Sequence, residues 1–138
     1  MKKRYPLFIL PFFLMLIASC AVTSGNLKVI SLKSIKTDQR GILFSWQIHS
    51  SLRNQFQSAY RLQVATSPES LKTSKNLVWD SGEVKSEQSN LVTAPGLTVN
   101  RAQTYYWRVK IQNRENQESD WSEPAVFRSG LLTEADWQ

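Results

Sequence analysis

The sequence predicts an all-β fold, a seven-stranded antiparallel sandwich of two sheets. Apolar and polar residues alternate with a period of two in several short segments, which is typical of strands that bury one face. Turn-forming residues such as Asp, Gly, Pro and Asn separate these segments at regular intervals. No stretch has a convincing helical period, and only residues 69–75 are expected to form a helical turn.

The seven expected strands follow one another along most of the chain. They span residues 27–32, 41–49, 58–66, 77–82, 89–93, 104–112 and 125–129. Trp46 and Trp107 lie on the apolar faces of the second and sixth strands, so we expect both side chains to fill the core. Arg61, Gln63 and Arg108 lie on the opposite faces, which we expect to be solvated.

Residues 1–19 predict a cleaved export signal. The basic cluster Lys2-Lys3-Arg4 precedes an apolar run that ends at Ala18. A membrane-spanning helix needs roughly 20 apolar residues, whereas this run is shorter and contains two prolines. We therefore exclude residues 1–19 from the fold.

The residues around the only cysteine indicate a lipid anchor. Ile17-Ala18-Ser19-Cys20 places small residues before a cysteine at the expected cleavage point, and this segment resembles the lipobox of bacterial lipoproteins. The resemblance implies a diacylglyceryl group on the Cys20 sulfur and a protein held by lipid on the bacterial cell envelope, in the periplasm or at the outer membrane. The alternative is an incidental cysteine beside an ordinary cleavage site. Residues 20–26 are small and polar, a composition that suits a tether.

The part of the chain beyond the tether has a length suited to one domain, which we expect at residues 27–130. A single cysteine cannot form an intramolecular disulfide, so the core must hold this domain together. The formal charge of +6 includes the basic cluster of the leader, and the remaining basic residues alternate with apolar ones. This weak and dispersed charge argues against nucleic acid as a partner.

The polar side chains form no pattern typical of catalysis or cofactor binding. Glycoside hydrolysis needs two carboxyl groups held across a sugar site, but most candidate carboxylates lie in predicted turns, where capping and solvation are the commoner roles. These candidates are Asp80, Glu83, Glu87, Glu115, Glu118, Asp120 and Glu123. His49 is the only histidine, and alone it cannot build a triad or a usual zinc site. We expect no catalytic residue, no cofactor and no metal.

Two tryptophans at strand ends or turns are candidates for contact with a carbohydrate. Sugar-binding modules stack pyranose rings on exposed tryptophans, and Trp79 and Trp121 are placed where such exposure is expected. Packing at the edge of the sandwich is the alternative, and the commoner one.

The strand residues resemble a fibronectin type III domain, a fold of the immunoglobulin-like class. The resemblance rests on Trp46 in an early strand, Tyr60 in the next, and the segment 99–109. It implies that Tyr105 is the buried tyrosine that fixes the preceding loop, with its hydroxyl bonded to backbone near Val99.

The order of the segments carries a more specific resemblance. The matching segments are residues 57–65, 79–84, 105–109, 121–127 and 130–132. Their succession is similar to the N-terminal fibronectin-III-like domain of bacterial α-L-rhamnosidases of glycoside hydrolase family 78. The resemblance covers about residues 43–137 and implies a non-catalytic accessory domain of an enzyme that breaks down rhamnosides. The family's catalytic carboxylates lie in a later barrel, so none carries over to this chain, and residues 27–38 lack the Asn-Pro and Gly usual in the family's first strand.

Residues 131–138 are expected to begin a linker to a further domain. Leu131, Leu132 and Trp137 are large apolar side chains placed after the last strand, and such clusters usually mark an interface, here with other rhamnosidase domains. The alternative is that they fold back on the sandwich. Two functions remain open: an accessory domain of a rhamnosidase, or a free-standing lipid-anchored module that binds a glycan or a protein.

Overall fold

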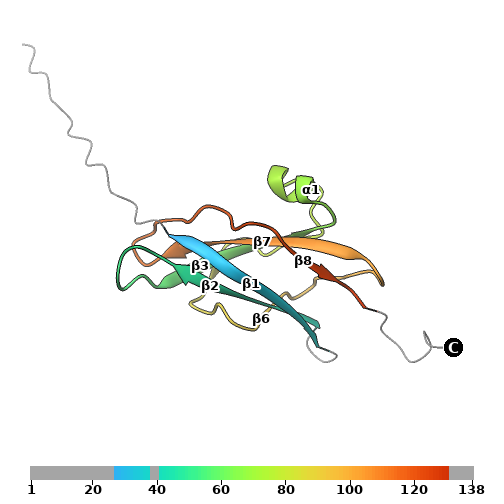
Figure 1. The fold of residues 1–138 in the computed structure, drawn as a ribbon, viewed down its shortest axis with the longest axis horizontal. Helices are drawn as coiled ribbons and strands as arrows, with labels where there is room; N and C mark the ends of the chain where they lie inside the picture. The colour runs from blue at the N-terminus through green and yellow to red at the C-terminus, as the bar shows by residue number, and fades with distance from the viewer. Residues whose placement is uncertain (1–26, 38–40, 131–138) are drawn as a thin grey trace, which may run out of the picture.

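The computed structural model describes residues 27–37 and 41–130 of the chain. Within these ranges, two antiparallel sheets pack face to face and one short helix lies outside them (Figure 1). The elements are β1 (Lys28–Thr37), β2 (Gly41–His49), β3 (Gln57–Ala65), α1 (Pro68–Thr73), β4 (Trp79–Asp80), β5 (Val84–Lys85), β6 (Val92–Thr93), β7 (Thr104–Asn113) and β8 (Ala125–Arg128). In the described part of the chain, no helix is both long and apolar enough to cross a membrane.

The two sheets differ in size. The smaller has the strand order β1-β2-β6, and the larger has the order β4-β3-β7-β8, with β5 also paired to β3. The long ladder between β3 and β7 places Leu62 opposite Val109. In the smaller sheet, β1 contains a bulge between Ile30 and Lys33, where Ser31 has a positive φ of 53°. The bulge shifts the register and lets β1 continue along β2 to Thr37.

The core lies between the sheets and is rich in aromatic side chains. The rings of Phe44 and Trp107 meet edge to face with centroids 4.7 Å apart. Trp46 and Tyr60 make a second edge-to-face pair at 5.2 Å. Both tryptophans are buried, which confirms the prediction that their strand faces point inward. Such pairs contribute about 0.5–1.5 kcal/mol beyond the apolar area that they bury.

Tyr105 fixes the connection that enters β7. Its ring is buried and stacks on Phe127 at a centroid distance of 5.3 Å. Its hydroxyl accepts a hydrogen bond from the backbone N–H of Asn100 at 2.7 Å. The role that the fibronectin III resemblance implied for this tyrosine is therefore confirmed.

The short elements depart from their expected bounds. The strand expected at 77–82 is reduced to β4, and β5 is an additional strand that the sequence pattern did not predict. The helix begins at Pro68 because the Ser67 side chain accepts the Ser70 N–H and caps it. It ends at Ser74, whose backbone adopts the left-handed conformation.

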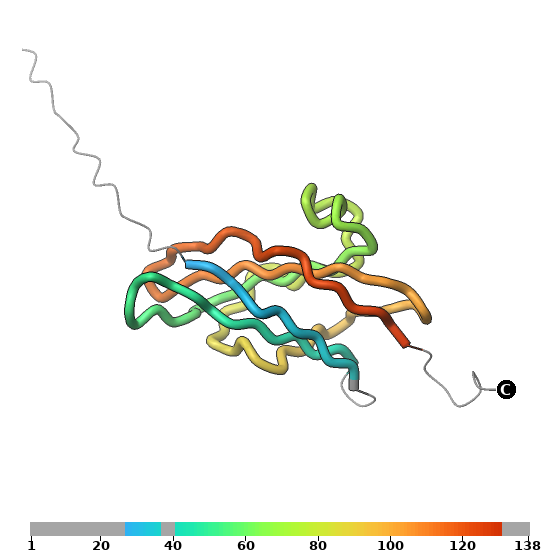
Figure 2. The backbone as a smooth tube through the Cα atoms, in the orientation of Figure 1, coloured from blue at the N-terminus to red at the C-terminus, as the bar shows by residue number. Residues whose placement is uncertain are grey.

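The described chain enters the sandwich at one end and leaves it at the other (Figure 2). β1 begins beside the end of β2, where Lys28 pairs with His49. β8 ends beside the start of β7, where Arg128 pairs with Thr104. Residues 27 and 130 therefore lie at opposite ends of the strands.

Candidate functional site

The segment that carries Trp121 is fastened to β7 by serine side chains. The hydroxyl groups of Ser119 and Ser122 accept the backbone N–H groups of Ile111 and Val109, at 3.0 and 3.1 Å. The backbone N–H groups of the same two serines donate to the carbonyls of Ile111 and Val109. This double attachment places Trp121 over the outward-facing side chains of β7.

Basic side chains of β7 lie against the Trp121 ring. The guanidinium carbon of Arg108 is 4.1 Å from the ring centroid, and the ammonium nitrogen of Lys110 is 5.4 Å from it. Contacts of this kind are worth about 0.5–2 kcal/mol each. Trp121 is half-buried, so part of its surface is committed to packing on β7.

Trp79 is also committed in part to the fold. Its indole N–H donates to the carbonyl of Pro95 at 3.0 Å, and its half-buried ring packs against the edge of the core. The edge packing proposed as the alternative for both tryptophans is present, while contact with a carbohydrate stays a prediction.

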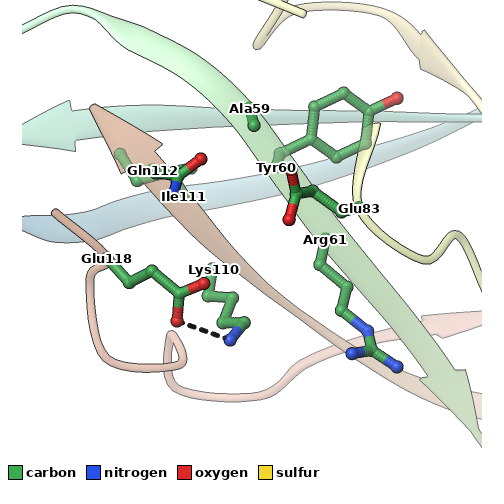
Figure 3. A pocket seen from close by; sticks show the side chains of 8 residues that line it. All are labelled: Ala59, Tyr60, Arg61, Glu83, Lys110, Ile111, Gln112 and Glu118. Carbon is green, nitrogen blue, oxygen red and sulfur yellow. Dashed lines mark hydrogen bonds and ion pairs between the residues drawn. The ribbon is translucent and has the colours of Figure 1, made fainter. Parts of the chain in front are cut away.

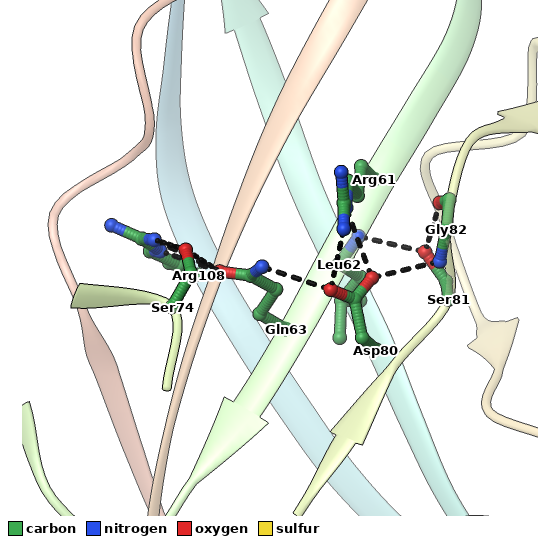
Figure 4. A network of polar contacts seen from close by, with 8 residues as sticks. All are labelled: Arg61, Leu62, Gln63, Ser74, Asp80, Ser81, Gly82 and Arg108. Carbon is green, nitrogen blue, oxygen red and sulfur yellow. Dashed lines mark hydrogen bonds and ion pairs between the residues drawn. The ribbon is translucent and has the colours of Figure 1, made fainter. Parts of the chain in front are cut away.

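A polar network covers the outer face of the larger sheet (Figure 4). Arg108 donates from Nε and Nη2 to Gln63 Oε1, at 3.1 and 2.9 Å, and from Nη2 to Ser74 Oγ at 2.9 Å. Gln63 Nε2 in turn donates to Asp80 Oδ2 at 2.9 Å. Asp80 also receives two parallel bonds from Arg61, at 3.0 and 2.8 Å. The network links β3, β4, β7 and the residue that ends α1.

The expectation that Gln63 and Arg108 are solvated is wrong. Both point away from the core, as their place in the alternation requires, but only 1% of Gln63 and 8% of Arg108 is exposed. The end of α1 and the segment around Trp121 cover them. The sequence contains no local signal for this burial, because the covering residues lie 11 to 13 positions away from Gln63 and Arg108.

The electrostatics of this network favour a charged Asp80. Burial acts to raise the pKa of its carboxyl group, but the hydrogen bonds from Arg61, Gln63 and the Gly82 N–H outweigh burial and lower it. The hydrogen bond to Asp80 raises the pKa of Arg61, while burial lowers that of Arg108. A carboxyl group held in its charged form cannot serve as a general acid at neutral pH.

A shallow groove of about 60 Å³ runs beside this network, between β5, β3, β7 and the turn after β7 (Figure 3). Its charged lining is Arg61, Glu83, Lys110 and Glu118. Lys110 Nζ lies 2.8 Å from Glu118 Oε2, and Glu83 pairs with Lys85. The hydrogen bond from Lys85 lowers the pKa of Glu83. The groove is far smaller than the 300–1,000 Å³ typical of ligand pockets.

Four of the seven candidate carboxylates are each matched by a separate basic side chain. The pairs are Asp80 with Arg61, Glu83 with Lys85, Glu87 with Arg114 and Glu118 with Lys110. Glycoside hydrolysis requires one carboxyl group with a raised pKa to act as the acid, and both shifts resolved for these groups are downward. Among residues 27–37 and 41–130, no three His, Cys, Asp or Glu side chains gather as metal ligands would.

Two larger hollows lie over the smaller sheet and its edge. One, of about 280 Å³, opens between β1 and β8 and is lined by Lys36, Phe127 and Arg128 among others. The other, of about 310 Å³, lies at the β1 bulge beside Ser45 and Asn90. The remaining predicted site residues, Cys20, Leu131, Leu132 and Trp137, fall outside the described residues.

Comparison with known proteins agrees with the immunoglobulin-like sandwich. Residues 30–133 match the family model described as Rha78A-like, N-terminal immunoglobulin domain. The chain belongs to this family. An α-L-rhamnosidase from Formosa agariphila is 41% identical to this immunoglobulin domain over 103 residues, which are 75% of the chain and 11% of that protein. An α-L-rhamnosidase from Streptomyces avermitilis is 32% identical over 84% of the chain and 11% of its own length.

Solved structures show the same domain within much larger proteins. The crystal structure of Streptomyces avermitilis α-L-rhamnosidase complexed with L-rhamnose superposes with a TM-score of 0.73 at 31% identity. The match spans 80% of this chain and 11% of that enzyme. The α-L-rhamnosidase of Dictyoglumus thermophilum superposes with a TM-score of 0.72 at 27% identity, over 80% of this chain and 13% of its own. The immunoglobulin domain thus spans about a tenth of the length of the curated relatives it matches.

Proposed function

We propose that this chain is the lipid-anchored N-terminal accessory domain of an α-L-rhamnosidase, exported to the bacterial cell envelope. In this role it joins an anchor on Cys20 to the domains that break down rhamnosides. The match to the N-terminal immunoglobulin domain of α-L-rhamnosidases carries the proposal, and the placement of the two ends supports it, since the chain enters beside Lys28 and leaves beyond Arg128 at the opposite end.

A domain with this layout separates the segment on its N-terminal side from the segment on its C-terminal side. β7 has ten residues, and at about 3.3 Å per residue it spans roughly 33 Å. This length separates the point where the described chain begins from the point where it ends. The apolar residues Leu131, Leu132 and Trp137 follow residue 130 in the sequence, and we propose that they contact the next domain.

The polar groups of the domain suit a structural role. The hydrogen bonds from Arg108 to Gln63 join β7 to β3, and the bidentate ion pair between Arg61 and Asp80 joins β3 to β4 and fixes both geometry and charge. The groove beside them is too small to enclose a sugar ring and the groups around it are already paired. These features favour a domain that positions its neighbour over a domain that catalyses hydrolysis.

The anchor is tested by expressing the full chain in a Gram-negative bacterium and labelling it with an alkyne analogue of palmitate. The wild-type chain is expected to carry the label and to sediment with membranes, and Cys20→Ala is expected to lose both because its side chain offers no thiolate. Ser19→Ala is the matched control, since it keeps a small residue before the cysteine and should retain the label. Label that persists on Cys20→Ala would refute the anchor.

A further inference from the structure

One end of the sandwich collects two long connections around the start of β1. The β2–β3 connection begins after His49, which pairs with Lys28 of β1. The β7–β8 connection begins at Asn113, whose side-chain nitrogen donates to Gln55 Oε1 of the β2–β3 connection at 2.7 Å. Figures 1 and 2 show both connections beside the point where the described chain begins. We call this region the entry end.

The β2–β3 connection presents two large apolar side chains to solvent at the entry end. Leu52 is 47% exposed and Phe56 is 53% exposed. The Arg114 guanidinium lies 4.9 Å from the centroid of the Phe56 ring, and its Nη2 is 2.6 Å from Glu87 Oε1. The entry end thus presents apolar side chains together with a cation, the two features with which amphipathic segments bind the boundary between lipid headgroups and acyl chains.

Charge at the entry end also favours an anionic surface. Lys28, Arg53 and Arg114 are exposed there, and Glu87 and Glu115 are the acidic side chains beside them. The balance is weakly basic, so electrostatic attraction to anionic headgroups assists apolar contact but does not replace it.

The tether keeps this end close to its anchor. Seven residue steps separate Cys20 from Leu27, and at no more than about 3.6 Å per residue they reach at most roughly 25 Å. The opposite end, where Ile35 lies near the close of β1, is separated from the start of the described chain by most of the length of the strands. Leu52 and Phe56 of the β2–β3 connection are thus exposed apolar side chains at the end nearer to the anchor, and Ile30 of β1, 41% exposed, lies close to the same end.

We propose that the entry end rests on the lipid bilayer, with Leu52 and Phe56 inserted at the level of the headgroups. This contact rests on the Cys20 anchor proposed above, and it adds a fixed orientation to a simple attachment. A domain seated in this way points its exit end, and any domain attached beyond residue 130, away from the membrane.

The single native cysteine makes the test direct. In the anchored protein the Cys20 sulfur carries the diacylglyceryl group, so a thiol introduced by Leu52→Cys takes an environment-sensitive nitrobenzoxadiazole dye without competition. Ile35→Cys is the matched control, because Ile35 is 52% exposed but lies toward the opposite end. Each full-length, acylated variant is reconstituted in vesicles of phosphatidylcholine and phosphatidylglycerol that contain a doxyl-labelled phospholipid quencher.

We expect dye at position 52 to be quenched severalfold more strongly than dye at position 35. Quenching at position 52 should be weaker in vesicles of phosphatidylcholine alone than in the mixed vesicles. Phe56→Cys should behave as Leu52→Cys does. Equal quenching at 52 and 35 in protein that carries the acyl label would refute the docking and leave the anchor intact. Loss of the acyl label from the wild-type chain would refute the anchor and the docking together. Circular dichroism of each labelled variant verifies that the fold is unchanged.

Discussion

Trp46 and Trp107 fill the same core but differ in what their indole N–H groups meet. The Trp46 N–H donates to Gln57 Oε1 at 2.9 Å, and Gln57 in turn donates to the carbonyls of Ser86 and Gln88. The Trp107 N–H is buried and has no hydrogen-bond partner within the described residues. Replacing each tryptophan with phenylalanine therefore separates the effect of ring size from that of the hydrogen bond.

The two substitutions should differ by about 2 kcal/mol or more. Either one opens a cavity of roughly 40 Å³, which costs about 1 kcal/mol at 24 cal/mol per Å³, and loses about 1 kcal/mol of apolar burial. Trp46→Phe also leaves the Gln57 oxygen unpaired, which adds about 1–3 kcal/mol. Trp107→Phe instead removes a buried, unpaired donor, which offsets most of its cost. We expect losses of about 3–5 kcal/mol for Trp46→Phe and about 0–1 kcal/mol for Trp107→Phe.

Urea denaturation of residues 24–138, followed by circular dichroism, measures both changes. The alanine variants provide the reference, since truncating either ring completely should cost at least about 3–5 kcal/mol and more than the phenylalanine change at the same position. Such a loss is a large share of the stability of a small domain. Equal losses for the two phenylalanine variants would refute the role assigned to Gln57. A loss below about 1 kcal/mol for both alanine variants would show that the assigned strand faces are wrong.

Three other predictions concern the polar face, the half-buried Trp121 and the tail. Because the folded pKa of Asp80 is lowered, its contribution of about 1 kcal/mol is complete above the unfolded pKa near 4 and is lost as pH falls through the folded pKa. Asp80→Asn should thus lower the free energy of unfolding at pH 7, and the gap from wild type should close on acidification. Trp121→Ala should lower stability by about 1–2 kcal/mol through lost contact with β7. Glycan-array binding that this substitution abolishes, without loss of fold, would favour the ligand role. Hydrogen exchange at Leu131, Leu132 and Trp137 should be rapid in this chain and slow when the next rhamnosidase domain is present in cis, whereas protection in the isolated chain would contradict the linker prediction.

Alternation in the sequence predicted the sheets because burial between two layers imposes a period of two. The bounds of β2 agree with the expected strand, and β3 and β7 differ by one residue or two from theirs. The role of Tyr105 was predicted for a different reason, because the resemblance to fibronectin III domains implied a buried ring with its hydroxyl bonded to backbone near Val99. The strands depend on local spacing, which one sequence contains, whereas the tyrosine depended on likeness to a known fold.

Burial of Gln63 and Arg108 could not be predicted in the same way. Alternation assigns each side chain to a face of the sheet, but it does not say whether another segment covers the outer face. Here the end of α1 contributes Ser74, and the segment fastened by Ser122 contributes the Trp121 ring. β5 was missed because two residues are too few to show a period, and β1 was shortened in prediction because its bulge interrupts the alternation.

The opposite placement of the two ends has a mechanical consequence. A pull applied between residues 27 and 130 acts along the strands, so β1 is loaded in shear against β2. The ladder between them joins eight residue pairs, from Lys28 with His49 to Thr37 with Gly41. Hydrogen bonds in an antiparallel ladder lie across the strands, so a force along β1 strains them together and cannot open them one at a time. Under tension between its two ends, the domain should yield only at high force, and it should do so in a single step.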